Sequence, residues 1–289
     1  MELVWLEDFN ALAQSGNFSR AAELRHVTQP AFSRRIRALE TWVGVDLFER
    51  TTQGATLTDA GRHMLDSAQE MTRRLYQMRH EAREVAGKQA RSLHFAATHS
   101  LSFTFFPGWV RAAERTSPIE AIRLHSDNMR ICEQMLLAGE VQFLLCHQHP
   151  DVPPQFPAES FHSKVVGSDL LIPLQGQSAE MTGASAELSL LGYTAESGLG
   201  RIVSARLRKE AQPPNLHTVF SSHLAAVLLS MALEGKGVAW LPKTLAEPEI
   251  ASSKLVRALD AHWDIPVEIR LFRPTMALSE FAEDLWAKL

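Results

Sequence analysis

Apolar residues recur every three or four positions in the first part of the chain, which predicts a series of amphipathic helices. The first is expected over residues 4–14, with Leu6 and Phe9 on its buried face, and ends at Gly16. A second is expected to open at Phe18-Ser19, with Ser19 as its N-cap. A third is expected to follow Thr28 as its N-cap and to end at Gly44.

Two short β-prone pieces follow, on either side of Gln53-Gly54, and predict a hairpin or wing. Residues 59–86 then read as one long helix capped by Thr58-Asp59. Such a helix is about 40 Å long, too long to be an internal helix of a small domain, so we expect it to pack on a partner. The apolar positions expected in that dimerisation contact are Leu65, Met71, Leu75 and Met78.

After residue 91 the pattern changes to buried apolar runs that alternate with helical stretches. The runs LHFAATH, IEAIRLH and VQFLLCH predict one set of strands, and DLLIPL, LSLLGYT, LHTVFSS and GVAWLP predict a second. The helical stretches lie near 100–115, 129–139, 198–210, 222–234 and 277–288. Strands and helices in this alternation are typical of an α/β domain, here with two lobes of similar size.

The composition fits a chain of about two globular domains. Of its 289 residues, 45% are apolar and 21% charged, with a formal net charge of −4. No apolar run approaches the roughly 18 residues that would span a membrane, and the N-terminus lacks the basic region of a secretory signal. The two cysteines, Cys132 and Cys146, form no CxxC pair, which fits a reducing compartment. We therefore expect a cytoplasmic protein without a membrane partner.

Basic charge is local rather than global, since residues 1–90 hold twelve basic and twelve acidic side chains. The local concentration is Arg34-Arg35-Ile36-Arg37 on the third helix, with Arg50 at the wing. Three helices with a short turn, a basic third helix and a wing are typical of a unit that reads DNA. A plain three-helix bundle with a solvated basic face is the alternative.

In the DNA-reading interpretation, small and polar residues let the start of the third helix enter the major groove. Gln29 suits paired hydrogen bonds to adenine, and Ser33 and Arg34 suit base edges or phosphates. Arg35 and Arg37 would neutralise phosphates, or else pair with Glu40 or Glu23. The residues predicted to contact DNA are Ser19, Thr28, Gln29, Pro30, Ser33, Arg34, Arg37, Arg50 and Thr51.

The string FNALAQSGNFSRAAELRHVTQPAFSRRIRALETWVGVDLFERTTQGATLTDAG closely resembles the N-terminal domain of LysR-type transcriptional regulators. The TQPAFSRRIRALE helix, the GVDLFER corner and the LTDAG start of the long helix occur in the family's order. The later βα pattern and GKGVAWLP resemble the same family's C-terminal domain, so the resemblance covers essentially the whole chain. The wing departs from the family pattern, because Thr52-Gln53-Gly54-Ala55 lacks the second basic residue that family members often carry. Contacts of the wing to the DNA backbone would therefore rest on Arg50 and Thr51.

The resemblance implies a sequence-specific transcriptional regulator rather than an enzyme. It implies a winged helix-turn-helix over residues 1–58, a linker helix over 59–87 and a hinge over 88–92. Residues 93–289 would form an effector domain like type II periplasmic binding proteins, with one lobe of 93–163 and 267–289 and another of 164–266. The implied partners are double-stranded DNA with an interrupted palindrome, a second copy in a homodimer or homotetramer, a small effector and RNA polymerase. A small-molecule binding protein or enzyme with an autoregulatory DNA-binding domain is the alternative class.

Within the family, AFSRRIRALE, AATHSLS and GVAWLP look most like the hypochlorite-responsive branch, whose sensing is attributed to methionine oxidation. The positions that align with that branch's sensor methionines are Ala113, Leu199 and His223, so those methionines are absent. Gating by sulfur oxidation, at other methionines or at Cys146, therefore stands as an alternative to gating by a reversible ligand.

In α/β sheets, ligands bind beyond the carboxyl ends of strands and at helix N-termini. Thr98-His99-Ser100 and Ser221-Ser222 each end a strand before a helix, and His147 ends another strand. These positions suit a small anionic effector, although Ser100 and Ser222 would also serve as simple helix caps. The residues expected to bind the effector are Thr98, His99, Ser100, His147, Phe220, Ser221 and Ser222.

His147 and His149 lie two residues apart on one predicted strand, and a shared metal site would need a third ligand brought in from elsewhere in the chain. We expect neither a metal nor a cofactor. No Ser-His-Asp order, paired carboxylate site or phosphate-binding glycine loop stands out to indicate catalysis.

Overall fold

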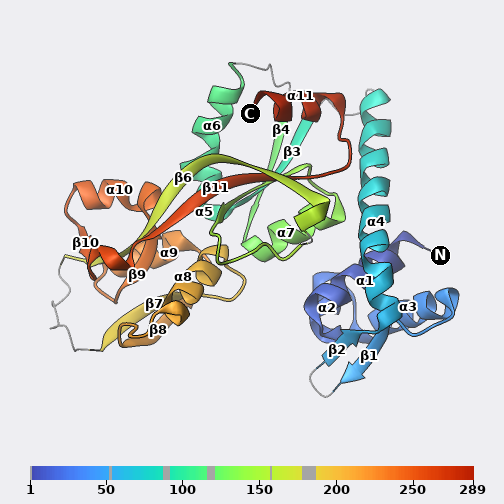
Figure 1. Cartoon of the computed structure of the whole chain (residues 1–289), viewed down its shortest axis with the longest axis horizontal. Coiled ribbons are helices and arrows are strands. Elements are labelled where there is room, and N and C mark those ends of the chain that lie inside the picture. Colours follow the sequence, from blue (N-terminus) through green and yellow to red (C-terminus); the bar gives the residue numbers. More distant parts are fainter. Residues whose placement is uncertain (1, 52–53, 87–91, 116–120, 157, 178–186) are drawn as a thin grey trace. The chain divides into compact units, whose positions relative to one another are not determined.

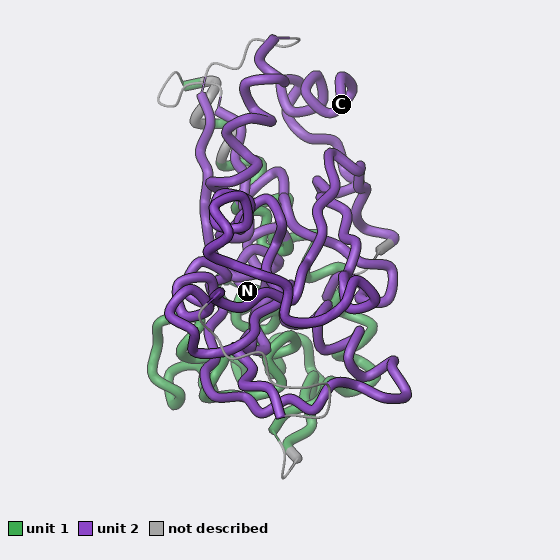
Figure 2. The backbone as a smooth tube through the Cα atoms, turned by 90° about the vertical axis from the view of Figure 1, so that its left-hand side faces the viewer, with its two compact units in different colours: residues 1–88, 137–140 green, residues 89–136, 141–289 purple. Residues whose placement is uncertain are grey.

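The computed structural model describes residues 2–51, 54–86, 92–115, 121–156, 158–177 and 187–289. The chain divides into two compact units, which are coloured green and purple in Figure 2. The first unit comprises residues 1–88 with 137–140, and the second comprises 89–136 with 141–289. The expected hinge over 88–92 falls outside the described residues except for Ser92.

The first unit is a winged helix-turn-helix continued by a long helix, as predicted (Figure 1). Its elements are α1 (Leu3–Ser15), α2 (Phe18–Leu24), α3 (Gln29–Val43), β1 (Phe48–Thr51), β2 (Gly54–Leu57) and α4 (Asp59–Val85). Strands β1 and β2 pair antiparallel as the wing. One apolar core joins the three short helices, the wing and the start of α4, and it includes Leu6, Phe9, Phe32, Ile36 and Leu39.

Capping at the helix starts differs from the prediction at one position. Asn17, not Ser19, is the N-cap of α2, because its Oδ1 accepts hydrogen bonds from the backbone N–H groups of Ser19 (2.9 Å) and Arg20 (3.1 Å). The expectation that Ser19 caps this helix is therefore wrong. Thr28 does occupy the N-cap position of α3, although its side chain makes no capping hydrogen bond, and Gly44 ends that helix in the left-handed conformation.

Two glycines allow close backbone contacts that hold this unit together. A Cβ at Gly61, in the LTDAG string, would lie 2.2 Å from the Leu47 carbonyl oxygen, so only glycine lets α4 pack on the preceding corner. A Cβ at Gly54 would lie 2.2 Å from the carbonyl oxygen of Gly16, and the neighbouring Ala55 N–H donates to that same oxygen (2.8 Å). The wing is thus fixed against the turn between α1 and α2.

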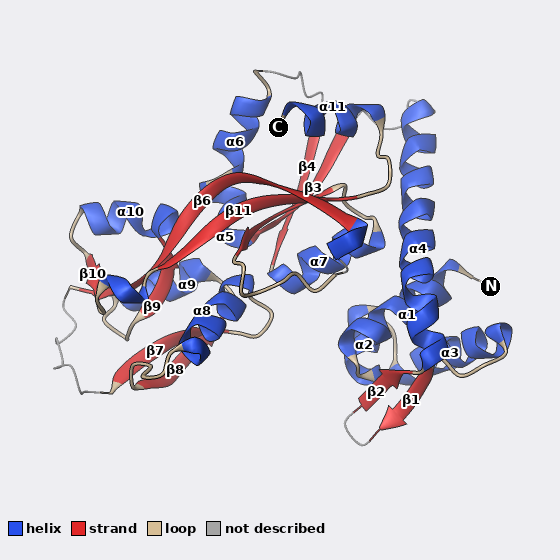
Figure 3. Ribbon diagram, in the orientation of Figure 1, coloured by secondary structure: helices blue, strands red, loops and turns tan. Residues whose placement is uncertain are grey.

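The second unit is an α/β domain (Figure 3). Its first half contains β3 (Ser92–Thr98), α5 (His99–Thr104), α6 (Phe106–Ala113), β4 (Ala121–Asp127), α7 (Met129–Ala138) and β5 (Phe143–Gln148). Then follow β6 (Phe161–Gly176), β7 (Leu188–Tyr193), α8 (Gly198–Lys209), β8 (Leu216–Ser222), α9 (Ala225–Leu233), β9 (Ala239–Pro242), α10 (Lys243–Ala251), β10 (Leu255–Arg257), β11 (Ile265–Pro274) and α11 (Glu280–Lys288).

The sheet has the strand order β10-β6-β11-β5-β3-β4, with β9 also paired to β6. Strands β4, β3 and β5 run parallel, whereas β11 is antiparallel to both β5 and β6. Strands β7 and β8 form a separate parallel pair. The parallel strands leave their carboxyl ends, and the helices that follow, at one edge.

The long antiparallel strands β6 and β11 belong to both halves of the domain. One apolar core surrounds β3, β5 and α11, and separate cores lie around β6, β9, α8 and α9. The lobe boundaries expected at residues 163/164 and 266/267 fall inside these continuous strands. The two-lobe division itself stays a prediction.

No helix among the described residues is long and apolar enough to cross a membrane.

Candidate nucleic-acid interface and ligand pocket

One face of α3 is open to solvent and carries most of the side chains predicted to read DNA. Thr28, Gln29, Pro30, Arg34 and Arg37 are exposed, whereas the opposite face of the helix is buried in the core of the first unit. Such a helix, with small and polar residues at its start and arginines further along, presents its N-terminal turn to a groove of DNA.

Ser33 differs from its neighbours because it is only 8% exposed. Its hydroxyl accepts a hydrogen bond from Gln29 Nε2 (3.1 Å). The prediction that Ser33 contacts DNA gains no support from this position. The geometry instead makes Ser33 a residue that orients the exposed Gln29 amide.

The remaining predicted contacts flank α3. Ser19 is exposed in the first turn of α2, and Arg50 is exposed on β1. The Arg50 guanidinium lies over the Phe18 ring, 4.5 Å from its centroid, a cation–π contact that holds the charge at the base of the wing. Thr51 ends β1, and Thr52 and Gln53 at the tip of the wing lie outside the described residues.

Arg35 turns inward and does not pair with Glu40 or Glu23. Its Nη1 lies 3.5 Å from Oδ2 of Asp8, a carboxylate on α1 that is fully buried. Arg25 Nε donates to the other oxygen of Asp8 (2.9 Å). Glu40 instead accepts the backbone N–H groups of Leu47 and Phe48. The interpretation of Arg35 as a phosphate contact is therefore unsupported.

The same polar network reaches the long helix. Arg25 also pairs with Glu7, and the Tyr76 hydroxyl of α4 donates to Glu7 Oε1 (2.5 Å). Burial and this bond to a carboxylate raise the pKa of Tyr76 to about 12. For Arg25, burial alone would lower the pKa, but hydrogen bonds and charge from Asp8 and Glu7 outweigh it and raise the pKa. The chain Tyr76–Glu7–Arg25–Asp8–Arg35 thus links α4 to α3.

The apolar stripe of α4 divides into two parts. Leu65 packs partly buried against the core of the winged domain. Met71, Leu75 and Met78 are exposed by 53%, 38% and 59%, an unusual state for three large apolar residues on one helical face. Beyond Arg79, Ala82 is the one residue of α4 whose side chain is described, and it is exposed.

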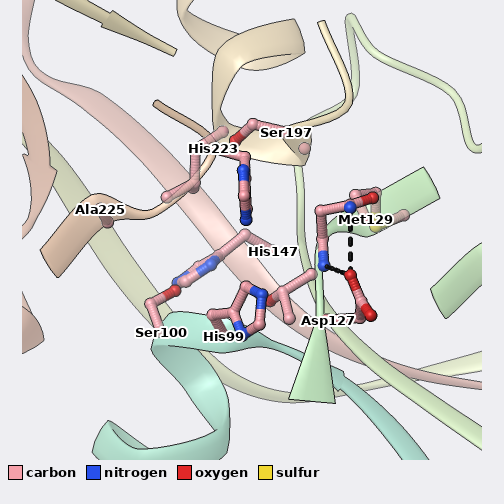
Figure 4. A pocket seen from close by; sticks show the side chains of 12 residues that line it. His99, Ser100, Asp127, Met129, His147, Ser197, His223 and Ala225 are labelled. Carbon is pink, nitrogen blue, oxygen red and sulfur yellow. Dashed lines mark hydrogen bonds between the residues drawn. The ribbon is translucent and has the colours of Figure 1, made fainter. Parts of the chain in front are cut away.

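In the second unit, one pocket collects residues from several strand ends and helix starts (Figure 4). The space inside that a water-sized molecule could occupy is about 20 Å³, enough for one or two small groups. Its lining consists of Thr98, His99, Ser100, Asp127, Asn128, Met129, His147, Ser197, Gly198, Leu199, His223 and Ala225.

Three helices of eight residues or more begin at this pocket. Helix α7 begins at Met129, α8 at Gly198 and α9 at Ala225, and all three residues line it. The first N–H groups of a helix have no partner within it, and the helix dipole adds positive potential there. Convergence of several such ends favours a negatively charged ligand.

Two buried polar atoms at the pocket have no hydrogen-bond partner among the described residues: Nδ1 of His147 and Oγ1 of Thr98. His147 is only 4% exposed, and its other nitrogen, Nε2, lies 3.4 Å from Oδ2 of Asp169. Leaving a polar group buried without a partner costs about 1–3 kcal/mol. Both atoms are therefore candidates for contact with a ligand.

The carboxylate behind His147 is ionised. Burial alone would raise the pKa of Asp169, but hydrogen bonds from His147, Thr244 and the Leu170 N–H, together with the charge that His147 carries when protonated, outweigh it, and the pKa is lowered. Its Oδ1 accepts the backbone N–H groups of Leu170 (2.8 Å) and Thr244 (3.2 Å), and its Oδ2 accepts the Thr244 hydroxyl (2.5 Å).

Two further histidines border the pocket. The His99 and His223 rings lie 5.6 Å apart, centroid to centroid, and Nδ1 of His99 is 3.1 Å from the Ser126 hydroxyl. Burial lowers the pKa of His99; the nearby Asp127 carboxylate opposes that shift, and His223 adds to it. His99 is therefore neutral at pH 7.

The structure brings four of the predicted effector residues together and leaves three outside. Thr98, His99, Ser100 and His147 line the pocket, whereas Phe220, Ser221 and Ser222 do not. Phe220 packs against the core around α9, and the Ser222 hydroxyl accepts the backbone N–H of Leu224 (3.1 Å). The wall on that side comes from His223 and Ala225 instead, because the helix begins later than expected.

Several lining residues escaped the sequence prediction although the same rule could have found them. Asp127-Asn128-Met129 joins β4 to α7 just as Thr98-His99 joins β3 to α5. Ser197-Gly198 precedes α8 in the same way, with Ser197 Oγ accepting the N–H of Gly200 (3.3 Å). Leu199 and His223, two of the positions that align with sensor methionines, line this pocket. The pocket lining also includes a methionine at another position, Met129.

Both cysteines are buried, free thiols. Burial raises the pKa of Cys132 to about 12 and raises the pKa of Cys146 well above its ordinary value. Neither therefore forms the reactive thiolate at neutral pH. Among the described residues, no cluster of three or more His, Cys, Asp or Glu side chains could hold a metal ion.

Comparison with known protein families matches nearly the whole chain. Residues 3–62 match the family model described as "Bacterial regulatory helix-turn-helix protein, lysR family". Residues 86–289 match the model described as "LysR substrate binding domain".

Individual proteins are similar over their full length. The HTH-type transcriptional regulator YjiE of Escherichia coli (strain K12) is 29% identical over 292 residues, covering 100% of this chain and 94% of that protein. Among solved structures, the LysR family transcriptional regulator VV2_1132 is 28% identical with a TM-score of 0.59, covering 99% of this chain and 98% of that one. Full-length HypT of Salmonella typhimurium, a hypochlorite-specific LysR-type regulator, is 28% identical with a TM-score of 0.58, covering 99% and 96%. Vibrio fischeri DarR, solved in complex with DNA, is 27% identical with a TM-score of 0.56, covering 99% and 97%.

Proposed function

Because this chain belongs to the LysR family of DNA-binding transcriptional regulators, we propose that the exposed face of α3 reads DNA and that a small anion in the pocket controls it. The family assigns the regulator class and the effector-binding domain.

For DNA recognition, we propose a division between specificity and affinity. Gln29, held by Ser33, and Arg34 lie on the exposed start of α3 and would contact base edges. Arg37, and Arg50 beside Phe18, would contact phosphates, with Ser19, Thr28, Pro30 and Thr51 completing the contact surface. The solved DNA complex of DarR supports the use of this domain for binding.

This division is tested with fluorescence anisotropy on a duplex selected by the protein from random sequences, beside an unrelated duplex. Gln29→Ala should lower affinity for the selected duplex by about 5- to 100-fold and leave the unrelated duplex unchanged. Arg50→Ala should weaken both and reduce the salt dependence by about one phosphate contact. Thr41→Ala, on an exposed position at the far end of α3, is the control. Equal losses on both duplexes for Gln29→Ala would contradict the assignment.

For effector control, the observation that carries the proposal is the pair of buried, unpartnered atoms at the meeting point of three helix starts. Thr98 Oγ1 and His147 Nδ1 lack partners, and the helix N-termini favour negative charge. The small volume suits an anion of a few atoms. Elements from both expected lobes line the pocket, so an occupant would favour one arrangement of the lobes and shift DNA affinity.

We test gating by measuring DNA affinity with and without bromide, formate or acetate at constant ionic strength, since DNA binding itself depends on salt. At least one anion should change affinity several-fold, within the roughly 5- to 150-fold range typical of allosteric coupling. Thr98→Val keeps the side-chain shape but removes the hydroxyl and should reduce the response. Ser230→Ala, exposed on α9 away from the pocket lining, should keep it. An absent response in the wild type to all three anions would refute anion control.

We further propose that the protein acts as a dimer through Met71, Leu75 and Met78, and that dimers assemble into tetramers on an interrupted palindrome. Contact with RNA polymerase belongs to the same proposal. The domain limits we propose are 1–58, 59–87, 88–92 and 93–289, and the proposed location is the cytoplasm, where DNA and polymerase are found. The relatives are transcriptional regulators, and we propose no catalytic role.

A second candidate is gating by methionine oxidation, and one observation favours it. Met129 lines the pocket, and a similar regulator is hypochlorite-specific. The cysteine form of this alternative is disfavoured by the burial and raised pKa of both thiols. Replacement of Met129 by leucine should abolish a response to hypochlorite if this candidate holds, and should leave an anion response in place if reversible binding holds.

A further inference from the structure

We infer that the anion enters this pocket together with one proton, which His147 takes up at Nδ1. This inference rests on the proposed function and adds the class of ligand and its regulation. The ligand would be the anion of a small acid, and it would bind more tightly as the pH falls.

With no anion bound, a neutral His147 ring carries hydrogen on only one of its two nitrogens. Asp169 is an ionised carboxylate that already accepts the Leu170 N–H and both donors of Thr244. Only a donor fits beside it, so Nε2 of His147, 3.4 Å away, carries the hydrogen. In the neutral ring, Nδ1 then holds a lone pair and no hydrogen.

The Nδ1 lone pair lies at the pocket, where the helix N-termini favour negative charge. Helices α7, α8 and α9 begin there, yet a neutral His147 would oppose an anion with its own electron pair. A proton on Nδ1 converts the group to a donor. The imidazolium then lies between the Asp169 carboxylate and the bound anion, so both of its N–H groups are satisfied and its buried charge is paired.

Other charged groups border the same space and are separate from this step. His99 comes from α5, His223 precedes α9, and Asp127 ends β4, where its Oδ1 accepts the Asn128 N–H (2.7 Å). On the neighbouring faces of α7 and α8, Glu133 is fully buried and holds Arg201 through two bonds of 2.9 Å. The charges of Glu133 and Arg201 therefore neutralise each other. His99 and His223 are therefore the competing proton acceptors that the experiment must separate.

Linkage sets the size of the effect. When the ring is neutral in the free protein and protonated in the complex, one proton is bound per anion, and the dissociation constant falls about tenfold for each unit drop in pH. A ligand that donates a hydrogen bond to neutral His147 would show no such dependence.

The experiment is calorimetric titration of the full-length protein with sodium bromide between pH 5.5 and 8.5. Buffers of different ionisation enthalpy are used, so that the number of protons taken up is measured directly. Bromide has no titratable group in this range, so every proton counted is bound by the protein. We expect close to one proton per bromide near pH 7.5, and affinity that falls about tenfold per unit of rising pH.

Variants locate the proton. His147→Asn places a neutral amide near Nδ1 and should bind bromide without proton uptake, with a flat pH profile. Asp169→Asn removes the balancing carboxylate and should also lose the uptake. His99→Asn and His223→Asn should retain it. Thermal denaturation verifies that each variant folds. If a variant does not fold, the number of protons taken up by the wild type still tests the inference.

Two results would overturn the inference while leaving the proposed function in place. One is bromide binding by the wild type with no proton uptake, and the other is uptake that disappears in His99→Asn or His223→Asn but persists in His147→Asn. If the wild type binds no anion at any pH, anion control itself fails, and the inference fails with it.

Discussion

At the scale of single residues, the partners of buried polar groups separate structural from ligand-binding positions. Asp8 and Glu133 are fully buried, and each carboxylate is neutralised by arginine. His147 is buried and Thr98 is half-buried, yet each keeps one buried polar atom without a partner among the described residues. The sequence alone does not separate the structural from the ligand-binding residues among these four, because segments distant in the chain determine whether each polar group is buried and paired.

Ser33 and Gln29 should act as one unit in DNA recognition. Because Ser33 is buried and accepts the Gln29 amide, Ser33→Ala should reduce specificity through Gln29 rather than through a contact of its own. The double variant should then lose no more than Gln29→Ala alone, a coupling of about 0.5–1.5 kcal/mol. Competition binding with selected and random duplexes measures this. Additive losses would show that Ser33 contacts DNA directly.

Cys132 and Cys146 should be inert in the folded protein. Their raised pKa keeps both as thiols at pH 8, and burial denies access to reagents. A disulfide reagent should therefore modify neither over the time in which it modifies both in guanidinium. Rapid labelling of native protein, with altered DNA binding that Cys146→Ser prevents, would restore the cysteine-oxidation alternative.

At the scale of elements, periodicity predicted most helices and strands, and packing decided the rest. The apolar stripes of α1, α3 and α4 and the buried runs of β3 and β5 stand out in the sequence. Helix α10 was missed because Pro248 interrupts its pattern, and the first half of β6 was missed because its residues are mostly half-buried and polar. The start of α9 was placed too early because Ser222 resembles a cap, although its hydroxyl caps a turn before the helix.

The network from Tyr76 to Arg35 should stabilise the orientation of α3 on α1 and α4. Tyr76→Phe removes only the hydroxyl that donates to Glu7 and should cost about 1 kcal/mol of unfolding free energy. Asp8→Asn leaves Arg25 and Arg35 with a neutral partner and should cost more, about 2–4 kcal/mol of unfolding free energy. This is less than for a fully buried ion pair, because both arginines are partly exposed to solvent. Chemical denaturation measures both losses. Arg37→Gln, exposed on the same helix, is the control and should change stability little.

The exposed part of the α4 stripe should be the dimer contact. Leu75→Glu would place an unpaired charge in that contact and should shift the protein to monomers in sedimentation velocity at micromolar concentration. Glu70→Gln is the matched control, since its side chain points about 100° away from that of Met71 around the helix. Leu65→Glu should instead unfold the winged domain, because Leu65 packs on its core. A dimer that persists in Leu75→Glu would place the contact elsewhere.

At the scale of the whole molecule, the two units have separate cores and separate tasks. The first combines the proposed DNA-reading face with the proposed dimer contact, and the second contains every lining residue of the proposed ligand pocket. Regulation therefore requires that occupancy of one unit changes the DNA affinity of the other. The differential affinity needed for this is modest, about 1–3 kcal/mol.

Separate cores predict two thermal transitions, of which an anion should shift only one. Bromide at 100 times its dissociation constant should stabilise the unit it binds by about 2.7 kcal/mol. For a domain of this size that raises the midpoint by about 5–10 °C. Differential scanning calorimetry of the full chain should show that the anion raises the midpoint of the effector-domain transition and leaves that of the winged-domain transition unchanged.

Two variants assign the transitions. Asp8→Asn should lower only the winged-domain midpoint, and Thr98→Val should reduce the shift that the anion causes. Equal movement of both transitions would mean that the units unfold together, so that effector binding and DNA reading share one cooperative structure rather than two coupled ones.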